Sequence, residues 1–338
     1  MLSTVFFSDC PLCGGKSDIL YANQTDTIHK SSGEWNVMVC QDCRLLWVYP
    51  KPTREEMQKL YENYQTHGLP SVTGRSFFQT LMEWLVVRHR VFRPAVVRHM
   101  LFSPSKSIPG LTKAVGLYFS AYLGQAESTH SNQLLDIGTG NGWFLRLMSD
   151  LGWEGTGVEP DPRAAEYAKQ VAGVNVVQGT LRPELFDGSS FDAVTLRHVV
   201  EHISNPTEVL ALIWRVLKLR GRLVIICPNT ASLGSRFFKQ HWRGMEVPRH
   251  LFLYNPCNLI QMVMDSGDFE IELMKTISLN AWWFYVSSQP KAHKLTGRLS
   301  ILLAAMAFGV REYCAKFRDS SVGEEIVLVV RKLPGRMT

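Results

Sequence analysis

The sequence predicts an open α/β fold built on a mostly parallel sheet, preceded by a small cysteine-rich head. Two observations carry this prediction. From residue 133 onward, apolar runs of four to seven residues alternate with stretches of helical period, which is typical of βαβ units on a parallel sheet. Before residue 60, two Cys-x2-Cys pairs enclose 26 residues, a spacing typical of a structural metal site.

The composition is that of a folded protein with room for one large domain and a smaller one. The chain has 338 residues, of which 46% are hydrophobic and 20% charged. Its first residues, MLSTVFFSDC, lack the pattern of a secretory signal, so its seven cysteines favour metal ligation or buried thiols over disulfides. We therefore expect a cytoplasmic protein. Its longest uncharged apolar stretch, residues 299–310, is too short to cross a bilayer.

Three regions are expected: a head at 1–60, a basic helical connector or lid at 61–127, and an α/β domain at 128–338 with an insertion at about 279–322. The net charge of +6 is concentrated in the connector, because residues 71–125 contain seven Lys or Arg and one Glu. This segment could be a solvated or packing helix, could bind an anionic acceptor, or could dock on anionic lipid together with 281–286 and 299–310. Nucleic acid is an unlikely partner, because no recognisable binding module accompanies the charge.

The head contains the predicted metal ligands Cys10, Cys13, Cys40 and Cys43. Four thiolates can bind one tetrahedral Zn²⁺ at about 2.3 Å, and such a site keeps no open position, so its predicted role is structural. A head of this size has little core, and metal binding would supply much of its stability. Redox cysteines and a partner-docking ribbon are the alternatives. Cys227, in an apolar run, is predicted to be a buried packing residue.

The elements of the α/β domain follow from the same periodicity. Strands are expected at 134–137, 155–159, 175–178, 192–196, 222–227, 269–278 and 324–332. Helices are expected at 142–151, 162–172, 206–218 and 256–266.

The first strand runs into a glycine turn, Asp-Ile-Gly-Thr-Gly-Asn-Gly at 136–142. A strand, a glycine turn and a helix place bare backbone N–H groups at the carboxyl edge of a parallel sheet, where such folds bind ligands. The dinucleotide fingerprint is not matched, because Trp143 stands where a glycine is required, so a nicotinamide cofactor is disfavoured. Glu159 ends the second strand and is placed to accept hydrogen bonds from both hydroxyls of a ribose.

The ordered motifs LLDIGTGNGWFL, GTGVEPD, VVQGTL, FDAVTLRHVVEHISNP and LKLRGRLVIICPN resemble those of class I S-adenosylmethionine-dependent methyltransferases. The resemblance implies a Rossmann-like fold with a seven-stranded, mostly parallel sheet and S-adenosylmethionine as cofactor. Asp136 would then contact the methionine portion or orient the turn, Glu159 would hold the ribose, and Gly179 with Thr180 would lie beside the adenine. The expected cofactor-binding residues are Asp136, Gly138, Thr139, Gly140, Gly142, Glu159, Pro160, Gly179, Thr180 and Arg197.

The stretches CPLCGG and CQDCRLLWVYPKP resemble the zinc-binding head found before many bacterial methyltransferases of this type, often ones that act on sugars or other small acceptors. This second resemblance implies a small N-terminal zinc ribbon. A purely structural strand, turn and helix remains the alternative to a cofactor site.

His198-Val-Val-Glu201-His202 also matches H-x-x-E-H, the pattern of inverted zinc peptidases. That chemistry needs both histidines on a sustained helix plus a third ligand. Here the motif leaves a strand and meets Ser204-Asn205-Pro206, which breaks a helix, so the peptidase is disfavoured. In a methyltransferase these residues would follow the fourth strand, where the methyl group is presented; packing and capping are a third interpretation.

Methyl transfer to a hydroxyl benefits from a general base, and histidine suits that role near neutral pH. The candidate catalytic residues are His250, His202, Glu201 and His198. The segment W-x-G-x-x-x-P-R-H-L at 242–251 resembles one that lies over the active-site mouth in this family. By that resemblance Trp242, Arg249, His241 and Asn229 are expected to bind the acceptor, whereas anchoring of the loop is the alternative for Arg249 and His250.

We therefore expect a methyltransferase that acts on a small-molecule or glycan-type acceptor, at oxygen more than at nitrogen or carbon. A sugar, a lipid-linked glycan and a quinone-like compound are the acceptor types expected, with peripheral contact at the inner membrane face as an option. An inactive scaffold that docks through its zinc head and basic helix is the main alternative, followed by an RNA methyltransferase and the zinc peptidase.

Overall fold

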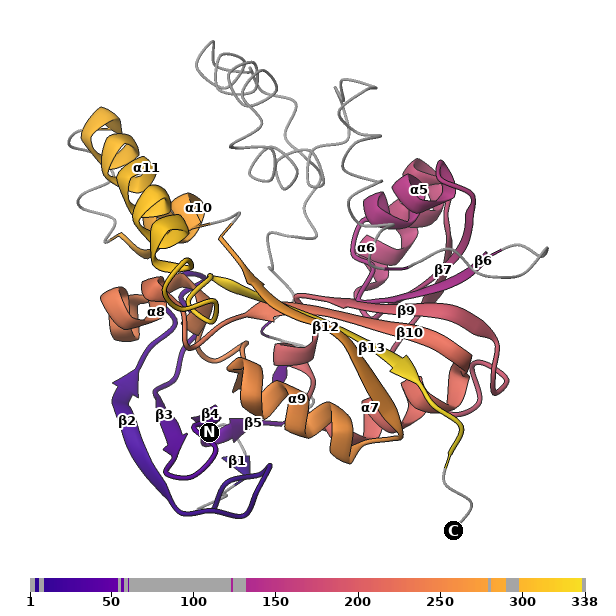
Figure 1. Ribbon diagram of the computed structural model, residues 1–338, viewed down its shortest axis with the longest axis horizontal. Coiled ribbons are helices and arrows are strands. Elements are labelled where there is room, and N and C mark those ends of the chain that lie inside the picture. The colour runs from indigo at the N-terminus through magenta and orange to yellow at the C-terminus, as the bar shows by residue number, and fades with distance from the viewer. Residues whose placement is uncertain are drawn as a thin grey trace. The chain divides into compact units, whose positions relative to one another are not determined.

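The computed structural model describes residues 4–5, 9–53, 56–57, 60, 123, 132–278, 281–289 and 298–335 (Figure 1). The chain forms two compact units. Unit 1 joins Met1–Tyr64 to Arg197–Trp214 and Ile225–Thr338, and unit 2 comprises Gln65–Leu196 and Arg215–Val224. The expected basic connector at 61–127 lies outside the described residues except for Leu123, so its helical structure and its charge-based roles stay predictions.

The predicted seven-stranded sheet is present, with strand order β12-β13-β10-β9-β6-β7-β8. β6 pairs in parallel with β7 and with β9, and β7 pairs in parallel with β8, whereas β12 is antiparallel to β13. The strands are β6 (Asn132–Ile137), β7 (Trp153–Glu159), β8 (Asn175–Gln178), β9 (Phe191–Arg197), β10 (Leu217–Pro228), β12 (Phe269–Ile277) and β13 (Glu325–Lys332). The mostly parallel α/β fold is thereby confirmed.

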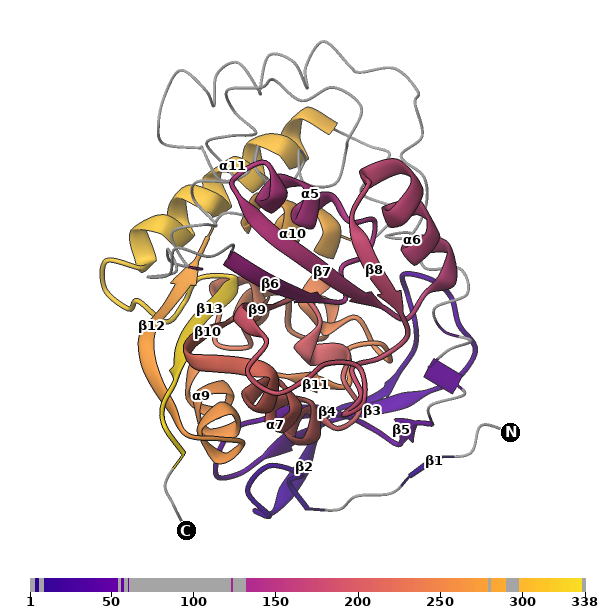
Figure 2. The ribbon, with the colours of Figure 1, turned by 90° about the vertical axis from the view of Figure 1, so that its right-hand side faces the viewer.

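In unit 2, helices α5 (Trp143–Ser149) and α6 (Pro162–Tyr167) follow β6 and β7, and a π-helical turn at Ala168–Ala172 extends α6 (Figure 2). The start of α6 is specified locally. Asp161 caps it by accepting the amide of Arg163, and Pro162 occupies the first turn, where its missing N–H costs nothing. The apolar side of the extended helix packs with β8 in a small cluster of Ala165, Ala168 and Val176.

Unit 1 contains the head, whose sheet has the order β11-β4-β3-β2. Three strands come from the head itself: β2 (Ser17–Gln24), β3 (Trp35–Cys40) and β4 (Leu46–Tyr49), all antiparallel. The fourth, β11 (Phe252–Leu253), lies some 200 residues further along the chain and pairs with β4 (Figure 2). A short pair, β1 (Thr4–Val5) and β5 (Lys51–Pro52), completes the strands of the head.

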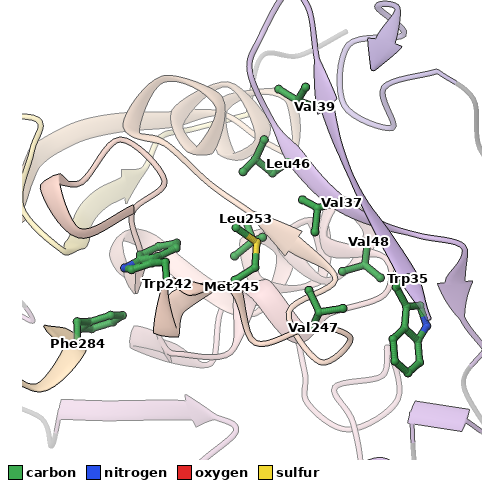
Figure 3. Packing of buried hydrophobic residues seen from close by; sticks show 10 residues of the cluster. All are labelled: Trp35, Val37, Val39, Leu46, Val48, Trp242, Met245, Val247, Leu253 and Phe284. Carbon is green, nitrogen blue, oxygen red and sulfur yellow. The ribbon is translucent and has the colours of Figure 1, made fainter. Parts of the chain in front are cut away.

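The head sheet packs on the segment after β10 to form one apolar core, shown in Figure 3. Trp35, Val37 and Val48 come from the head, and Trp242 and Leu253 come from the distant segment. Burying each large apolar side chain contributes about 1.5–3 kcal/mol relative to leaving it exposed. The head is therefore stabilised by residues near 250 as well as by its own strands.

Unit 1 also contains several short helical elements. They are the 3₁₀ turns Val200–His202, Lys239–His241 and Arg243–Met245, and the helices α8 (Leu233–Phe238), α9 (Pro256–Asp265) and α10 (Ala281–Ser288). Helix α7 (Pro206–Val216) leads from unit 1 into unit 2.

The insertion expected at 279–322, whose burial the sequence left undecided, is helical where the structure describes it. It contributes α10 and α11 (Arg298–Ala315), which contact each other. Phe284 of α10 is buried, whereas Tyr313 on α11 and Phe317 just beyond it are 60% and 77% exposed. No helix among the described residues is long and apolar enough to cross a membrane.

The element boundaries differ most at β10, which begins at Leu217 and not at 222 as expected. Its first residues include the partly or fully exposed Lys218 and Arg220, so an apolar run starts only further along the strand. The polar start was therefore attributed to the end of the preceding helix, which in the structure stops at Val216.

Candidate functional site

The four cysteines of the head lie together. The Sγ atoms of Cys10 and Cys43 are 3.6 Å apart and those of Cys13 and Cys40 are 3.5 Å apart, and all four lie within 4.8 Å of one another. Cys10 and Cys13 lie on a tight turn, in which the amide of Gly14 donates to the carbonyl of Cys10 at 2.9 Å. Four thiols in this arrangement fit the donor set of a tetrahedral Zn²⁺ ion.

The environment of these thiols differs from one to the next. Burial raises the pKa of the Cys10 thiol to about 11. Burial acts in the same direction on Cys40, but amide donors from Cys43 and Asp42 bring the pKa of its thiol down to about 7. A metal ion requires thiolates, so its binding would release protons from the more basic members of the set.

The second knuckle is held from outside the head. The side-chain amides of Asn255 and Asn258 donate to the carbonyl of Cys43 at 3.4 and 3.3 Å. The same two residues form a capping box at the start of α9. The cysteine cluster is therefore attached directly to the helix that follows β11.

The expected cofactor turn lies in unit 2, between β6 and α5. Gly138, Gly140 and Gly142 adopt positive φ angles of 68°, 58° and 76°, a region that favours glycine. At Gly142 an added Cβ would lie 2.7 Å from a side-chain carbon of Val174, so close packing also demands glycine there. Asp136, 1% exposed at the end of β6, accepts the hydroxyl of Thr195 at 2.5 Å.

Glu159 holds this turn closed. One carboxylate oxygen accepts the amide of Gly140 at 2.7 Å, and the other accepts the amide of Asp161 at 2.9 Å. The amides of Gly138 and Thr139 bond to the carbonyl of Val158. The expectation of bare amides facing a ligand is therefore wrong for this conformation, because protein acceptors already satisfy them, and Glu159 itself is 2% exposed.

The turn nevertheless fits a nucleoside attached to an amino acid. A Cβ added to Gly140 or Gly179 would meet nothing within 4 Å, so open space lies over the backbone at both positions. Pro160 and Thr180 are exposed beside it. A carboxylate oxygen can accept more than one hydrogen bond, so Glu159 can accept ribose hydroxyls by sharing or replacing its present donors. Arg197 is half-buried at the end of β9, where the chain enters unit 1.

The candidate catalytic residues come together in unit 1. His202 lies on the 3₁₀ turn after β9, and its ring is 4.7 Å from that of His250 in an edge-to-face arrangement. Nδ1 of His202 bonds to the carbonyl of Arg249 at 3.0 Å, and Nδ1 of His250 bonds to the carbonyl of Gly244 at 2.6 Å. A carbonyl only accepts, so both Nδ1 atoms donate, and Nε2 is the atom of each ring that can act as an acceptor.

Glu201 lies against this pair of histidines and is 1% exposed. Its backbone carbonyl accepts the amide of Leu251 at 2.8 Å, which links the 3₁₀ turn to the start of β11. Oε1 is 3.6 Å from Nδ1 of His198, whose Nε2 lies 2.8 Å from Glu325. Although burial opposes ionisation, His198 and the neighbouring histidines hold the pKa of Glu201 below its ordinary value.

His250 is completely enclosed. Burial lowers the pKa of its imidazole to about 4, with a further contribution from His202 and opposition from Glu246. The ring is therefore neutral at physiological pH. His202 is half-buried, which makes it the more accessible of the two candidate bases.

Three of the expected acceptor residues are engaged within the protein, and their contact with an acceptor stays a prediction. Arg249 is 1% exposed; it pairs with Asp26 at 2.7 Å and donates to the carbonyl of Leu60. Trp242 is also 1% exposed and donates to Glu324 at 2.9 Å. Asn229 is fully buried and donates to two carbonyls, those of Ser321 and Gly323. These contacts anchor the loop; His241 alone is exposed.

Sequence reasoning missed two acids that complete the cluster. Glu246 lies 3.6 Å from His250 and 3.6 Å from His29, and it pairs with Arg243. Asp26 binds Arg249 and caps the loop at 28–31. Glu246, four residues before His250, could have been singled out by that spacing, whereas nothing in the sequence near Asp26 indicates its partner.

The peptidase alternative fails on local structure. The residues of H-x-x-E-H occupy the end of β9 and a 3₁₀ turn of three residues, Val200–His202, where a sustained helix would be required. His198 has a positive φ of 55°, which excludes it from any such helix.

Comparison with known proteins agrees with the fold. Residues 106–272 match a family model described as a methyltransferase domain. The chain is 36% identical over 102 residues to the mitochondrial ubiquinone biosynthesis O-methyltransferase of Schizosaccharomyces pombe, which covers 28% of this chain and 36% of that protein. It is 30% identical over 135 residues to the uncharacterized methyltransferase YcgJ of Bacillus subtilis, covering 37% and 53%.

These aligned regions span about half or less of the length of either relative. The solved structure of YcgJ overlaps 65% of this chain and 98% of its own, with 20% identity and a TM-score of 0.44. Residues 106–272 therefore resemble a methyltransferase domain, and the strand order is that of the predicted Rossmann-like fold.

Proposed function

We propose that this protein is an S-adenosylmethionine-dependent methyltransferase that methylates a hydroxyl of a small-molecule or glycan-type acceptor. One observation carries the proposal: the glycine turn at 138–142 and the buried Glu159 opposite it fall within the segment that matches the methyltransferase family model. S-adenosylmethionine would supply an activated methyl group. The protein then has to bind donor and acceptor, align the acceptor atom with the methyl carbon, and exclude water.

The donor would lie over Gly140 and Gly179, where the backbone is open. Glu159 would exchange the amide of Gly140 for ribose hydroxyls, and Asp136, held by Thr195, would keep the turn in place. The strands that lead to the donor turn and to the histidine cluster, β6 and β9, pair in parallel register. Parallel strands of this kind carry ligand sites at their carboxyl ends.

The acceptor proton would pass to the histidine cluster. His202 is the preferred base, because the carbonyl of Arg249 holds its Nδ1–H and the ring is less buried than that of His250. A base of this kind accelerates transfer by about 10² to 10⁴. His250 would position His202 through its ring contact and add to the apolar, water-poor surroundings.

An oxygen acceptor agrees with the names of the relatives. The S. pombe protein is named for O-methylation in ubiquinone biosynthesis, as is a relative from Xanthomonas oryzae that is 29% identical over 132 residues. A quinone-like or lipid-linked acceptor would be found at a membrane surface. A zinc ion in the four-cysteine cluster is part of the same proposal, in a structural role.

Peripheral contact with anionic membrane is supported by the insertion. Leu303, Val310, Tyr313 and Phe317 are exposed and recur at helical spacing along and just beyond α11, with Arg311 and Arg318 exposed beside them. Flotation with phosphatidylglycerol vesicles should recover the protein, and Phe317→Ser with Tyr313→Ser should reduce recovery. Leu219→Ser is the matched control, since Leu219 is 58% exposed on β10. Equal recovery of all forms would remove the membrane from the proposal.

The decisive experiment separates donor binding from transfer. S-adenosylhomocysteine should raise the melting temperature of the wild-type protein, and labelled donor should methylate components of extracts fractionated into nucleotide sugars, lipid-linked glycans, quinones and RNA. His202→Ala should keep donor binding and lose turnover by about 10² or more, whereas Glu154→Gln, at an exposed residue of β7, should keep both. Absence of any donor-induced shift would leave the inactive scaffold as the better explanation.

A further inference from the structure

The strongest unexplained feature outside the donor turn is the carboxylate of Glu201. Both of its oxygens are shielded from solvent, and among the described residues neither has a partner within hydrogen-bond distance; Oε1 lies 3.6 Å from Nδ1 of His198. A buried carboxylate costs several kcal/mol unless it is paired or coordinates a metal. The acid thus occupies a position that protein contacts alone satisfy poorly.

The groups facing Glu201 are suited to metal binding. Glu201, His202 and His250 each offer one ligand atom, and these atoms all lie within 4.8 Å of one another. Around a tetrahedral ion with bonds of about 2.1 Å, ligand atoms are about 3.4 Å apart, so modest side-chain rotation would complete the site. Two imidazoles and one carboxylate form a donor set used by divalent first-row metals with open positions.

The hydrogen bonds made by the second ring nitrogen of each histidine also favour metal binding. Metal-bound histidine usually donates its second ring N–H to a carbonyl or carboxylate, which fixes the tautomer and the ring direction. His202 and His250 both do this, through the carbonyls of Arg249 and Gly244. The backbone bond from Leu251 to the carbonyl of Glu201 joins the two segments that carry the ligands. The cluster is therefore held in place before any ion arrives.

We propose that Glu201, His202 and His250 bind one divalent transition-metal ion, at a site separate from the four cysteines. The ion would keep open positions for water or for an oxygen of the acceptor. Glu246, with a carboxylate oxygen 3.6 Å from Nε2 of His250, adds negative charge on the same side. The inference concerns ion binding and stands independently of methyl transfer.

If the protein is also a methyltransferase, the ion and a proton compete for the same Nε2 lone pairs. A molecule with the ion bound would not use His202 as a base. The ion would instead polarise the acceptor hydroxyl and lower its pKa. The proton would leave to solvent as the oxygen attacks the methyl carbon, and the methyl–sulfur bond would break to release S-adenosylhomocysteine. Removing the bound ion with a chelator would then lower turnover. If His202 acts as the base instead, turnover would persist after chelation.

Cobalt binding to the full-length protein tests the proposal. Protein carrying one zinc per chain in the cysteine cluster is titrated with Co²⁺ alone; zinc is retained by the thiolates because it binds there more tightly. We expect one further metal per chain, with weak visible bands typical of nitrogen and oxygen ligands and no thiolate charge-transfer bands. The proton NMR spectrum of the wild-type complex should contain two strongly shifted exchangeable signals, one from each Nδ1–H.

Variants make the assignment specific. Glu201→Gln keeps the size of the side chain and should weaken Co²⁺ binding at least tenfold, as should His202→Ala and His250→Ala. His241→Ala is the matched control, an exposed histidine nearby in the sequence, and should bind like the wild type. The proposal is overturned if the zinc-loaded protein takes up no Co²⁺, if the three variants bind with wild-type affinity, or if the spectrum shows thiolate ligands only. The wild-type NMR signals decide the matter even where a variant fails to fold.

Discussion

The donor turn and the histidine cluster are built in opposite ways. The turn is one continuous strand, turn and helix, in which Glu159 at the end of the next strand reaches back over a short stretch of chain to bind Gly140. The cluster joins the 3₁₀ turn after β9, the segment at 244–250 and, through Asp26 and His29, a loop of the head. The first depends on local backbone conformation, and the second depends on contacts between residues more than 200 positions apart. Damage to the head should therefore reach the cluster and spare the turn.

Loss of the metal ion from the head should have the largest effect and should affect the histidine cluster more than the donor turn. Cys40→Ser removes a ligand, and we expect the free energy of unfolding to fall by at least about 4 kcal/mol, a part of the roughly 10–16 kcal/mol that a structural zinc site can supply. Turnover should be lost, because β4 pairs with β11 directly after His250. Calorimetry and a donor-binding assay report the two effects separately. Cys257→Ser, at an exposed cysteine, should change neither.

Breaking the ion pair between Asp26 and Arg249 comes next. Asp26→Ala leaves a buried guanidinium without its carboxylate, which costs about 3–5 kcal/mol. Urea denaturation measures the loss, and donor affinity should stay within about twofold if the turn is independent. The control is Asp150→Ala, which breaks an exposed pair with Arg146 worth about 0.5 kcal/mol or less. A similar loss in both variants would contradict the importance given to the buried pair.

Glu159→Gln addresses the other side of the comparison. Removing the charge weakens hydrogen bonds to ribose hydroxyls worth about 1.5–3 kcal/mol, so S-adenosylhomocysteine should bind roughly 10- to 100-fold more weakly. Titration calorimetry gives the affinity. Glu154→Gln on the same strand, where the exposed side chain accepts a hydrogen bond from Gln133, should have no effect. Co²⁺ binding at the cluster should be unchanged in both.

The smallest expected effect is a change in how steeply the free energy of unfolding depends on pH. The pKa of His250 is lowered to about 4 in the folded chain, so between about pH 6.5 and 4 the unfolded chain binds more protons. Stability contributed by the neutral ring is thus complete above about pH 6.5 and decreases as the pH falls toward 4, by at most about 1.4 kcal/mol per pH unit. His250→Gln should flatten this dependence in urea titrations, and His241→Gln should not. An unchanged slope in His250→Gln would mean that the buried ring is not the group responsible.

The sequence predicts most of the fold because local patterns determine it. Hydrophobic periodicity and the turn residues between apolar runs locate every strand of the seven-stranded sheet. The one large error in a strand boundary, at β10, comes from Lys218 and Arg220 at the polar start of that strand. The glycine turn and the four cysteines are predicted for the same reason, because the spacing of these residues in the sequence largely determines how they are arranged in space. β11 was not predicted: two residues, Phe252 and Leu253, pair with β4 because of where the fold carries them.

The histidine cluster could be predicted only in part. His202, Glu201 and His250 were identified by residue type, yet the partners of Arg249 and Trp242 were not. Polar residues next to a catalytic histidine suggest an acceptor site when their partners are unknown. In the structure those partners are Asp26 and Glu324, at separations of 223 and 82 residues, which no local pattern indicates.

The pairing of β11 with β4 has a practical consequence for dissecting this protein. A shortened form beginning at residue 128 would look complete by sequence, because it retains every motif of the transferase domain. It would nevertheless expose Leu253 and Val247 to water and leave Arg249 facing no acid, next to the very histidines whose activity such a fragment would be made to measure. Inactivity of that fragment would therefore be uninformative about the chemistry of the whole chain.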